Sequence, residues 1–233
     1  MSIKAVVFDM DDTLYKEEEY ILSGLEAIDH WVQNHFNSIG FYNYAIELFK
    51  KGERKFIFDK VLAKMNLIYD KRLILNLVNI YRNHKPDIKL LEDASWVLEN
   101  FSEVKLGLIT DGYYVSQMQK IKALSLESMF DSIILSDKYG RDNWKPSKLP
   151  YEKARLQLQC EHHECVYIGD NIKKDFITAK KLGWRTIHVL RNEGIYSAET
   201  MELDYHAHYQ IKDLTELIYI SELRQLFKQN IVR

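Results

Sequence analysis

The stretch AVVFDMDDTLYKEE, residues 5–18, joins a short apolar run directly to three aspartates and a threonine. The aspartates are Asp9, Asp11 and Asp12, and Thr13 follows them. A continuous apolar run of this length is typical of a strand that is covered on both faces, as in a parallel sheet. Carboxylates crowded at the end of such a strand repel one another. The pattern therefore indicates that a cation offsets their charge.

Four later apolar runs resemble the first one. They are KLGLIT (105–110), SIILS (132–136), CVYIGD (165–170) and RTIHVL (185–190). Segments in which apolar residues recur at helical spacing lie between these later runs. This alternation predicts an α/β fold with a doubly wound parallel sheet. A short last strand and one closing helix, with Asp213 as its N-cap, are expected over residues 208–227.

Residues 17–86 have a different pattern, because their apolar and aromatic residues recur at helical spacing throughout. The pattern predicts an all-helical insert of about four helices between the first strand and the rest of the sheet. Pro86 would end the last of these helices. We therefore expect a core domain of residues 1–16 and 87–233 and an inserted domain of residues 17–86.

Composition restricts the class of protein and the class of partner. The formal net charge of −2 gives no electrostatic footprint for a nucleic acid polymer or an anionic membrane. No apolar stretch approaches the roughly 20 residues of a membrane span, and the N-terminus has no signal-peptide pattern. Two cysteines are too few for a disulfide scaffold. A cytoplasmic protein that binds a small ligand is expected, as a monomer or a homodimer.

Polar residues stand where the predicted strands end. In an open parallel sheet, ligands bind beyond the carboxyl ends of the strands, so these side chains would share one crevice. The residues are Asp9, Asp11, Thr110, Asp111, Lys145 and Asp170. The aspartates offer only oxygen ligands, which favour Mg²⁺, an ion that keeps waters and binds substrate phosphate. A lysine and a hydroxyl group beside such an ion suit a phosphoryl group.

Four segments, in this order, resemble the motifs of the haloacid dehalogenase superfamily. DMDDT resembles its DxDxT first motif, and LGLIT resembles its second motif, an apolar strand that ends in Thr. WKPS resembles the third motif, and GDNIKKD resembles the fourth. The resemblance covers essentially the whole chain, and the four motifs together are highly specific. The wide spacing between motifs one and two leaves room for the helical cap that this family calls C1.

The resemblance implies a phosphatase of this superfamily, because its dehalogenases lack an acid at the position of Asp11. Asp9 would attack phosphorus and form an aspartyl-phosphate. Asp11 would protonate the leaving alcohol and later take a proton from water. Mg²⁺ would be held by the Asp9 carboxylate, the Asp11 backbone carbonyl and Asp170.

The remaining motif residues would hold the phosphoryl group or support the residues that do. Thr110, Asp111 and Lys145 are expected to bind the phosphoryl oxygens, Asp111 through backbone amides. Three further residues are expected to orient the residues that bind the metal ion and the phosphoryl group, without binding either directly. They are Thr13, Asn171 and Asp175. Tyr15 and Tyr20, just beyond the first motif, are candidates for substrate contact.

The expected reaction is Mg²⁺-dependent hydrolysis of a small phosphorylated metabolite, either a sugar phosphate or a nucleoside monophosphate. A sugar-phosphate mutase or another phosphotransferase using the same aspartate pair is an alternative. A protein that binds a phosphorylated ligand without turnover is another. CEHHEC (160–165) superficially resembles a zinc site through Cys160, His162, His163 and Cys165, although a surface loop with one buried thiol is the preferred interpretation.

Overall fold

The computed structural model describes residues 2–191, 202–229 and 231. The chain forms two compact units. The first consists of Met1–Glu17 and Lys89–Arg233 and is called the α/β unit below. The second, Glu18–Ile88, is called the helical unit. Within the described part of the chain, no helix is both long and apolar enough to cross a membrane.

A six-stranded sheet forms the centre of the α/β unit, and every neighbouring pair of its strands is parallel. The strands are β1 Ala5–Phe8, β2 Lys105–Thr110, β3 Ser132–Leu135, β4 Cys165–Gly169, β5 Arg185–Val189 and β6 Tyr209–Ile211. Their order across the sheet is β3-β2-β1-β4-β5-β6. The order reverses between β1 and β4, which is where doubly wound sheets open a crevice for ligands. The predicted fold class is confirmed.

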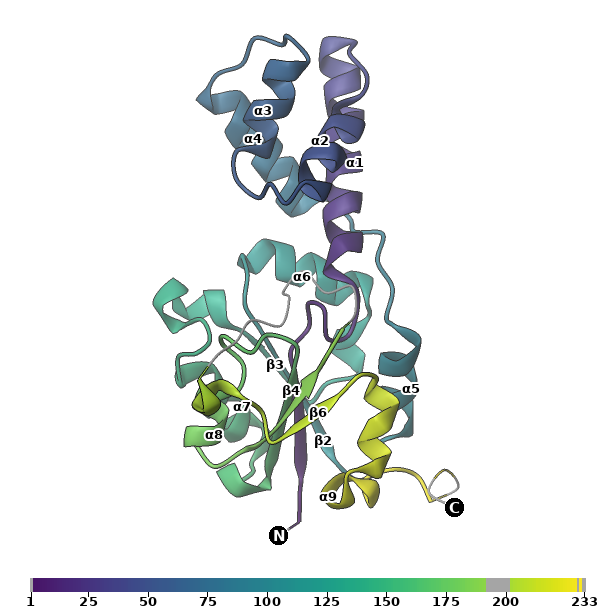
Figure 1. The fold of residues 1–233 in the computed structure, drawn as a ribbon, viewed down its shortest axis with the longest axis vertical. Helices are drawn as coiled ribbons and strands as arrows, with labels where there is room; N and C mark the ends of the chain where they lie inside the picture. Colours follow the sequence, from purple (N-terminus) through teal and green to yellow (C-terminus); the bar gives the residue numbers. More distant parts are fainter. Residues whose placement is uncertain (1, 192–201, 230, 232–233) are drawn as a thin grey trace. The chain divides into compact units, whose positions relative to one another are not determined.

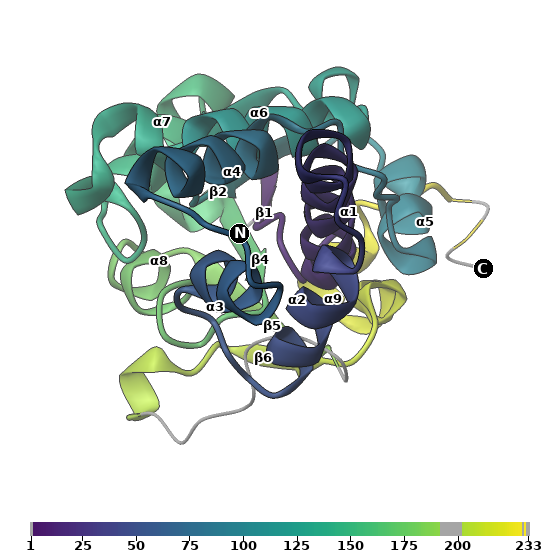
Figure 2. The same cartoon turned by 90° about the horizontal axis from the view of Figure 1, so that it is seen from above.

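Helices cover both faces of this sheet (Figures 1 and 2). The helices of the α/β unit are α5 Glu92–Asn100, α6 Tyr114–Ala123, α7 Leu149–Leu158, α8 Ile177–Lys181 and α9 Ser221–Arg224. On the face covered by α7 and α8, Val7 and Tyr167 are buried with Tyr151 and Trp184. Phe8 packs on the opposite side against Phe101, with ring centroids 6.4 Å apart. Burial on both faces explains why the strands read as continuous apolar runs.

The helical unit has four helices and its own apolar core. The helices are α1 Glu17–Phe36, α2 Phe41–Lys50, α3 Ile57–Lys64 and α4 Lys71–Asn83, and the first residue of α1 belongs to the α/β unit. Ile28, Phe41, Leu62 and Leu77 are buried together. Tyr20 is also buried, with its ring 5.5 Å from that of Tyr81.

The prediction of one closing helix is wrong. Leu214–Tyr219 forms a 3₁₀-helix, Ile220 is extended at φ −81° and ψ 117°, and only Ser221–Arg224 is α-helical. The N-cap prediction is confirmed, because the Asp213 carboxylate accepts a hydrogen bond from Thr215 N at 2.8 Å. The buried residues explain the difference, since they recur every third position, as a 3₁₀-helix requires. They are Leu214, Leu217, Ile220, Leu223 and Leu226.

The segment CEHHEC connects α7 to β4 through a 3₁₀-helix, His162–Glu164. Both cysteines are buried, rather than one as expected. Burial raises the pKa of the Cys165 thiol to about 12. Trp184 Nε1 donates a hydrogen bond to His162 Nδ1 at 2.8 Å, so the ring has a structural partner. Among the described residues, no metal-binding group of three His, Cys, Asp or Glu side chains includes this segment.

An ion pair connects distant parts of the α/β unit. Arg191 follows β5, and its guanidinium lies 2.6 Å from the carboxylate of Asp93 in α5. The same guanidinium donates a hydrogen bond to the backbone carbonyl of Thr13 at 2.6 Å. Asp93 also accepts a hydrogen bond from Leu214 N at 2.8 Å. The loop after β1, the start of α5 and the last 3₁₀-helix are therefore joined by the buried Asp93 and the largely buried Arg191.

Replacing Asp93 by Ala should destabilise the protein strongly. The change leaves the Arg191 guanidinium without its carboxylate and Leu214 N without its acceptor. Breaking a buried ion pair in this way typically costs about 3–5 kcal/mol. We expect a reduction of that size in the free energy of unfolding, measured by urea denaturation. The exposed neighbour Glu92 provides the control, because Glu92→Ala should change stability by less than about 1 kcal/mol. Equal effects of the two substitutions would contradict this account.

Candidate active site

A pocket of about 350 Å³ opens in the α/β unit, and residues after β1, β2 and β4 line it. The lining residues are Asp9, Asp11, Glu17, Asp111, Gly112, Trp144, Lys145, Asp170, Asn171 and Lys174. Most of the residues predicted from the sequence meet here. The pocket lies at the switch point of the sheet, where β1 and β4 are neighbours.

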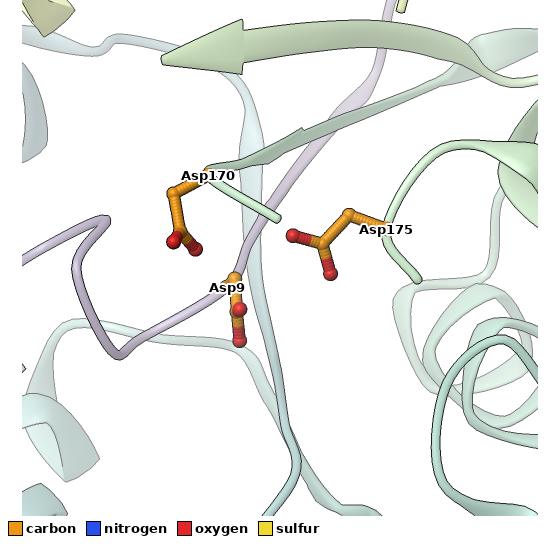
Figure 3. A group of neighbouring side chains, drawn as sticks. All are labelled: Asp9, Asp170 and Asp175. Carbon is orange, nitrogen blue, oxygen red and sulfur yellow. The ribbon is translucent and has the colours of Figure 1, made fainter. Parts of the chain in front are cut away.

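Three buried carboxylates come together in the pocket region (Figure 3). Asp9 follows β1, Asp170 follows β4, and Asp175 lies in the loop after β4. One oxygen of each carboxylate lies within 4.8 Å of the others. Burial, followed by the negative charges of Asp175 and Asp9, raises the pKa of Asp170 well above its usual range. Such a group of ionised oxygens is stable only with added positive charge.

The position of Asp175 depends on the glycine that ends β4. A Cβ atom on Gly169 would collide with the Asp175 carboxylate, so no larger residue fits without displacing it. The loop then turns so that Asn171 N donates a hydrogen bond to Asp175 Oδ2 at 2.9 Å. Asn171 Oδ1 accepts a hydrogen bond from Lys173 N at 3.1 Å, which fixes the same turn. Gly169 of the fourth motif thus leaves space for the carboxylate of Asp175, the last residue of that motif.

Lys145 supplies positive charge to this group from the loop before α7. Its Nζ lies 2.8 Å from Asp9 Oδ1 and 2.8 Å from Asp175 Oδ1. It also donates a hydrogen bond to the hydroxyl of Tyr167 at 2.8 Å. Burial opposes the charge on Lys145, but Asp175 and Asp9 outweigh burial and raise its pKa. Burial also raises the pKa of Asp9 to about 6, although Lys145 acts in the opposite direction.

Asp11 has a separate set of partners. Lys120 Nζ in α6 lies 2.6 Å from Asp11 Oδ1. Gln117 Nε2 donates a hydrogen bond to Asp11 Oδ2 at 2.8 Å, and the hydroxyl of Tyr15 donates to Asp11 Oδ1. Burial alone would raise the pKa of Asp11, but the charge of Lys120 and these hydrogen bonds outweigh it and lower the pKa. The Asp11 carboxylate is therefore held in one orientation.

The loop after β1 contains one unusual backbone conformation and two hydrogen bonds made by side chains. Asp12 adopts a left-handed conformation with φ 50°, which a short polar side chain tolerates. Its Oδ1 accepts a hydrogen bond from Glu17 N at 2.8 Å, at the first residue of α1. The Thr13 hydroxyl donates to Asp170 Oδ1 at 3.4 Å. Tyr15 is fully buried, so it contacts Asp11 and does not line the pocket as a substrate contact would.

The residues after β2 lie beside Lys145. The Asp111 carboxylate accepts a hydrogen bond from Lys145 N at 3.1 Å and lies 3.4 Å from Lys174 Nζ. Gly112 lines the pocket with φ 132°, a conformation that favours glycine. The Thr110 hydroxyl is fully buried and accepts a hydrogen bond from Gln117 at 2.5 Å. Thr110 is not among the residues that line the pocket.

Several residues of the site were not predicted from the sequence. Gln117 and Lys120 lie three residues apart on α6, so they share one helix face, but nothing in the sequence indicates that this face meets Asp11. Lys174 lies inside the fourth motif, and its position between the predicted Asp170 and Asp175 was a usable signal. Trp144 lines the pocket from the position before Lys145, and Glu17 lines it from two positions after Tyr15.

Known proteins similar to this chain support the superfamily that its sequence motifs resemble. The family model of haloacid dehalogenase-like hydrolases matches residues 6–189. A glyceraldehyde 3-phosphate phosphatase from Methanocaldococcus jannaschii is 31% identical over 229 residues, which cover 94% of this chain and 96% of the relative. The pyrophosphatase PpaX from Bacillus velezensis is 23% identical over 95% of this chain and 98% of its own.

Solved structures share the fold at lower identity. The putative hydrolase YfnB from Bacillus subtilis, bound to magnesium, has a TM-score of 0.66 with 17% identity, over 94% of this chain and 99% of that chain. A putative β-phosphoglucomutase from Thermotoga maritima has a TM-score of 0.63 with 18% identity, over 94% of this chain and 100% of that chain. The predicted superfamily is confirmed by the family match and by the first of the relatives. This chain belongs to the haloacid dehalogenase-like hydrolase family.

Proposed function

We propose that this chain is a Mg²⁺-dependent phosphatase that hydrolyses a small phosphomonoester, such as a sugar phosphate, through an aspartyl-phosphate on Asp9. The observation that carries the proposal is the placement of Asp9 between Lys145, at 2.8 Å, and the buried carboxylates of Asp170 and Asp175. Relatives named glyceraldehyde 3-phosphate phosphatase and pyrophosphatase support phosphoryl chemistry.

The donor set fits a hard divalent cation. The grouped side chains offer only carboxylate oxygens, and Mg²⁺ prefers such ligands. The raised pKa of Asp170 indicates the same need, because a bound cation would stabilise its ionised form. Asp9, Asp170 and the backbone carbonyl of Asp11 would hold the ion. When bound, Mg²⁺ would reduce the repulsion between the Asp9 carboxylate and a phosphate group.

Asp9 is the proposed nucleophile. One of its oxygens would attack phosphorus in line with the ester bond, and the bond between phosphorus and the leaving oxygen would break. Lys145 would stabilise the charge on the phosphoryl oxygens, together with the backbone amides at Asp111 and Gly112. The Asp111 carboxylate already pairs with Lys174, so its contribution would come from the backbone.

Asp11 is the proposed acid and base. It would donate a proton to the leaving alkoxide in the first step. In the second step it would accept a proton from the water that attacks phosphorus, which releases inorganic phosphate and regenerates Asp9. The lowered pKa of Asp11 suits the base of the second step. An entering phosphate dianion would raise that pKa by charge repulsion, which suits the acid of the first step.

The helical unit, Glu18–Ile88, is proposed to act as a C1 cap over a small substrate. It is inserted between β1 and β2, which is the position of a C1 cap in this family. A cap that closes over the pocket would exclude water from the aspartyl-phosphate until the second step.

Replacing Asp9 by Asn should remove phosphate release, because an amide is a poor nucleophile. Inorganic phosphate should be measured over a panel of sugar phosphates, nucleotides and simple esters, with Mg²⁺ and with EDTA. We expect metal-dependent release by the native protein and a loss of at least about 1,000-fold in Asp9→Asn. The exposed Asp142→Asn is the control and should keep full activity.

Three results would oppose the proposal. Substantial release by pure Asp9→Asn protein would contradict the nucleophile assignment. A folded, metal-loaded native protein that moves phosphate between positions of a sugar without releasing it would instead be a phosphotransferase. Saturable binding of a phosphorylated compound without any turnover would indicate a binding protein.

Replacing Lys120 by Met should misplace the Asp11 carboxylate, and the effect should be largest for substrates whose leaving oxygen must be protonated by Asp11. Asp11 would lose the contact at 2.6 Å that orients it. Protonation matters most for a poor leaving group, so kcat/KM for glycerol 3-phosphate should fall about 10- to 100-fold. The loss for 4-nitrophenyl phosphate, which has a good leaving group, should be much smaller. Lys122→Met, at an exposed position of the same helix, should change neither value. Equal losses for both esters in Lys120→Met would count against a positioning role.

A further inference from the structure

Glu17 is a carboxylate in the pocket that the proposed reaction does not use. The lining residues include five carboxylates, from Asp9, Asp11, Glu17, Asp111 and Asp170, and two lysines, Lys145 and Lys174. Even with one divalent cation bound, fully ionised carboxylates would outnumber these positive charges by one. A phosphate dianion adds two more negative charges. The pocket therefore has no positive charge left for a second anionic group on a substrate.

The other lining carboxylates have a hydrogen-bond or ion-pair partner inside the protein, whereas the described part of the chain provides neither for the Glu17 carboxylate. The contacts are Asp9 with Lys145 at 2.8 Å, Asp11 with Lys120 at 2.6 Å, Asp111 with Lys174 at 3.4 Å and Asp170 with Thr13 at 3.4 Å. The Glu17 carboxylate makes no hydrogen bond and no ion pair to a described residue. Its oxygens are therefore available to accept hydrogen bonds from a ligand.

The place of Glu17 in the pocket is set by its backbone. It is the first residue of α1, and its N–H donates to Asp12 Oδ1 at 2.8 Å. Burial raises the pKa of Glu17 to about 7, and the next largest influences are the charges of Asp11 and Lys120. Tyr15, two residues before Glu17, donates a hydrogen bond to Asp11 Oδ1, and Glu17 N is hydrogen-bonded to Asp12, so Glu17 lies on the Asp11 side of the pocket. In the proposed reaction this is the side of the leaving alcohol, away from the phosphate contacts of Lys145.

We propose that Glu17 selects the organic part of the substrate: its carboxylate accepts a hydrogen bond from a hydroxyl group there and disfavours a carboxylate. This proposal rests on the proposed phosphatase function. An ionised carboxylate only accepts hydrogen bonds, so a hydroxyl group is a matched partner and a second carboxylate is not. Like charges in a partly buried pocket repel each other far more strongly than in water.

The substrate class is therefore a phosphate ester of a neutral hydroxylated compound, rather than a phosphorylated acid. Glycerol 3-phosphate and 3-phosphoglycerate form a suitable pair of probes, because one has a CH₂OH group where the other has a carboxylate. The ratio of their kcat/KM values for phosphate release, called the neutral-to-acid ratio here, measures the selection directly. Loss of folding or of general activity lowers both values and leaves this ratio unchanged.

The experiment measures the neutral-to-acid ratio in four proteins loaded with Mg²⁺, at a pH above the raised pKa of Glu17, where its carboxylate is ionised. The native protein should prefer glycerol 3-phosphate, and Glu17→Gln should lower the ratio by about tenfold or more. Glu17→Asp keeps the charge and should still reject 3-phosphoglycerate. Glu18→Gln removes the neighbouring carboxylate, which does not line the pocket, and should leave the ratio as in the native protein.

The outcomes separate this proposal from the proposed function. If the native protein releases phosphate and Glu17→Gln keeps the native ratio, the selective role of Glu17 is overturned and the phosphatase function stands. A native preference for 3-phosphoglycerate would also overturn it. If the folded, metal-loaded native protein releases phosphate from neither probe nor from any ester of the wider panel, the phosphatase function fails and this proposal fails with it.

Discussion

A lysine ammonium group without contact to solvent, that of Lys145, lies 2.8 Å from two carboxylates, and the rest of the site depends on this arrangement. A buried charge is tolerated only when its partners are held in place, because removal of either one leaves an unpaired ion. The partners come from different strands: Asp9 follows β1, and Asp175 belongs to the loop after β4. The parallel pairing of these strands is therefore a condition for the charge pairing. Gly169 meets a second condition, since only glycine leaves space for Asp175.

The sequence was sufficient to predict the sheet and the residues at the strand ends. β1 and β4 are buried along their whole length, so their apolar runs are visible without knowledge of their neighbours. Asp9 and Asp170 follow such runs directly, and the order of a doubly wound sheet brings them to the same crevice. Both predictions depend on local sequence and on one general rule of topology, which is why they could be made.

The features that escaped prediction depend on how elements pack. Gln117 and Lys120 reach Asp11 because α6 presents one of its faces to the loop after β1, and their spacing cannot indicate which partner that face meets. Tyr15 was expected at the substrate and instead donates to Asp11 from a fully buried position. The closing segment shows a related error. Its buried apolar residues recur every third position, a period that fits the observed 3₁₀-helix rather than the single helix predicted there.

The two buried cysteines have a practical consequence for spectroscopy. Burial raises the pKa of both thiols, so each remains in the protonated form that reacts slowly with alkylating reagents and oxidants. Residues 18–88 contain no cysteine. One cysteine introduced at an exposed position there would accept a fluorescent or spin label selectively, with Cys160 and Cys165 left in place. The two native cysteines would therefore take up little label, and the signal would report on the helical unit during turnover.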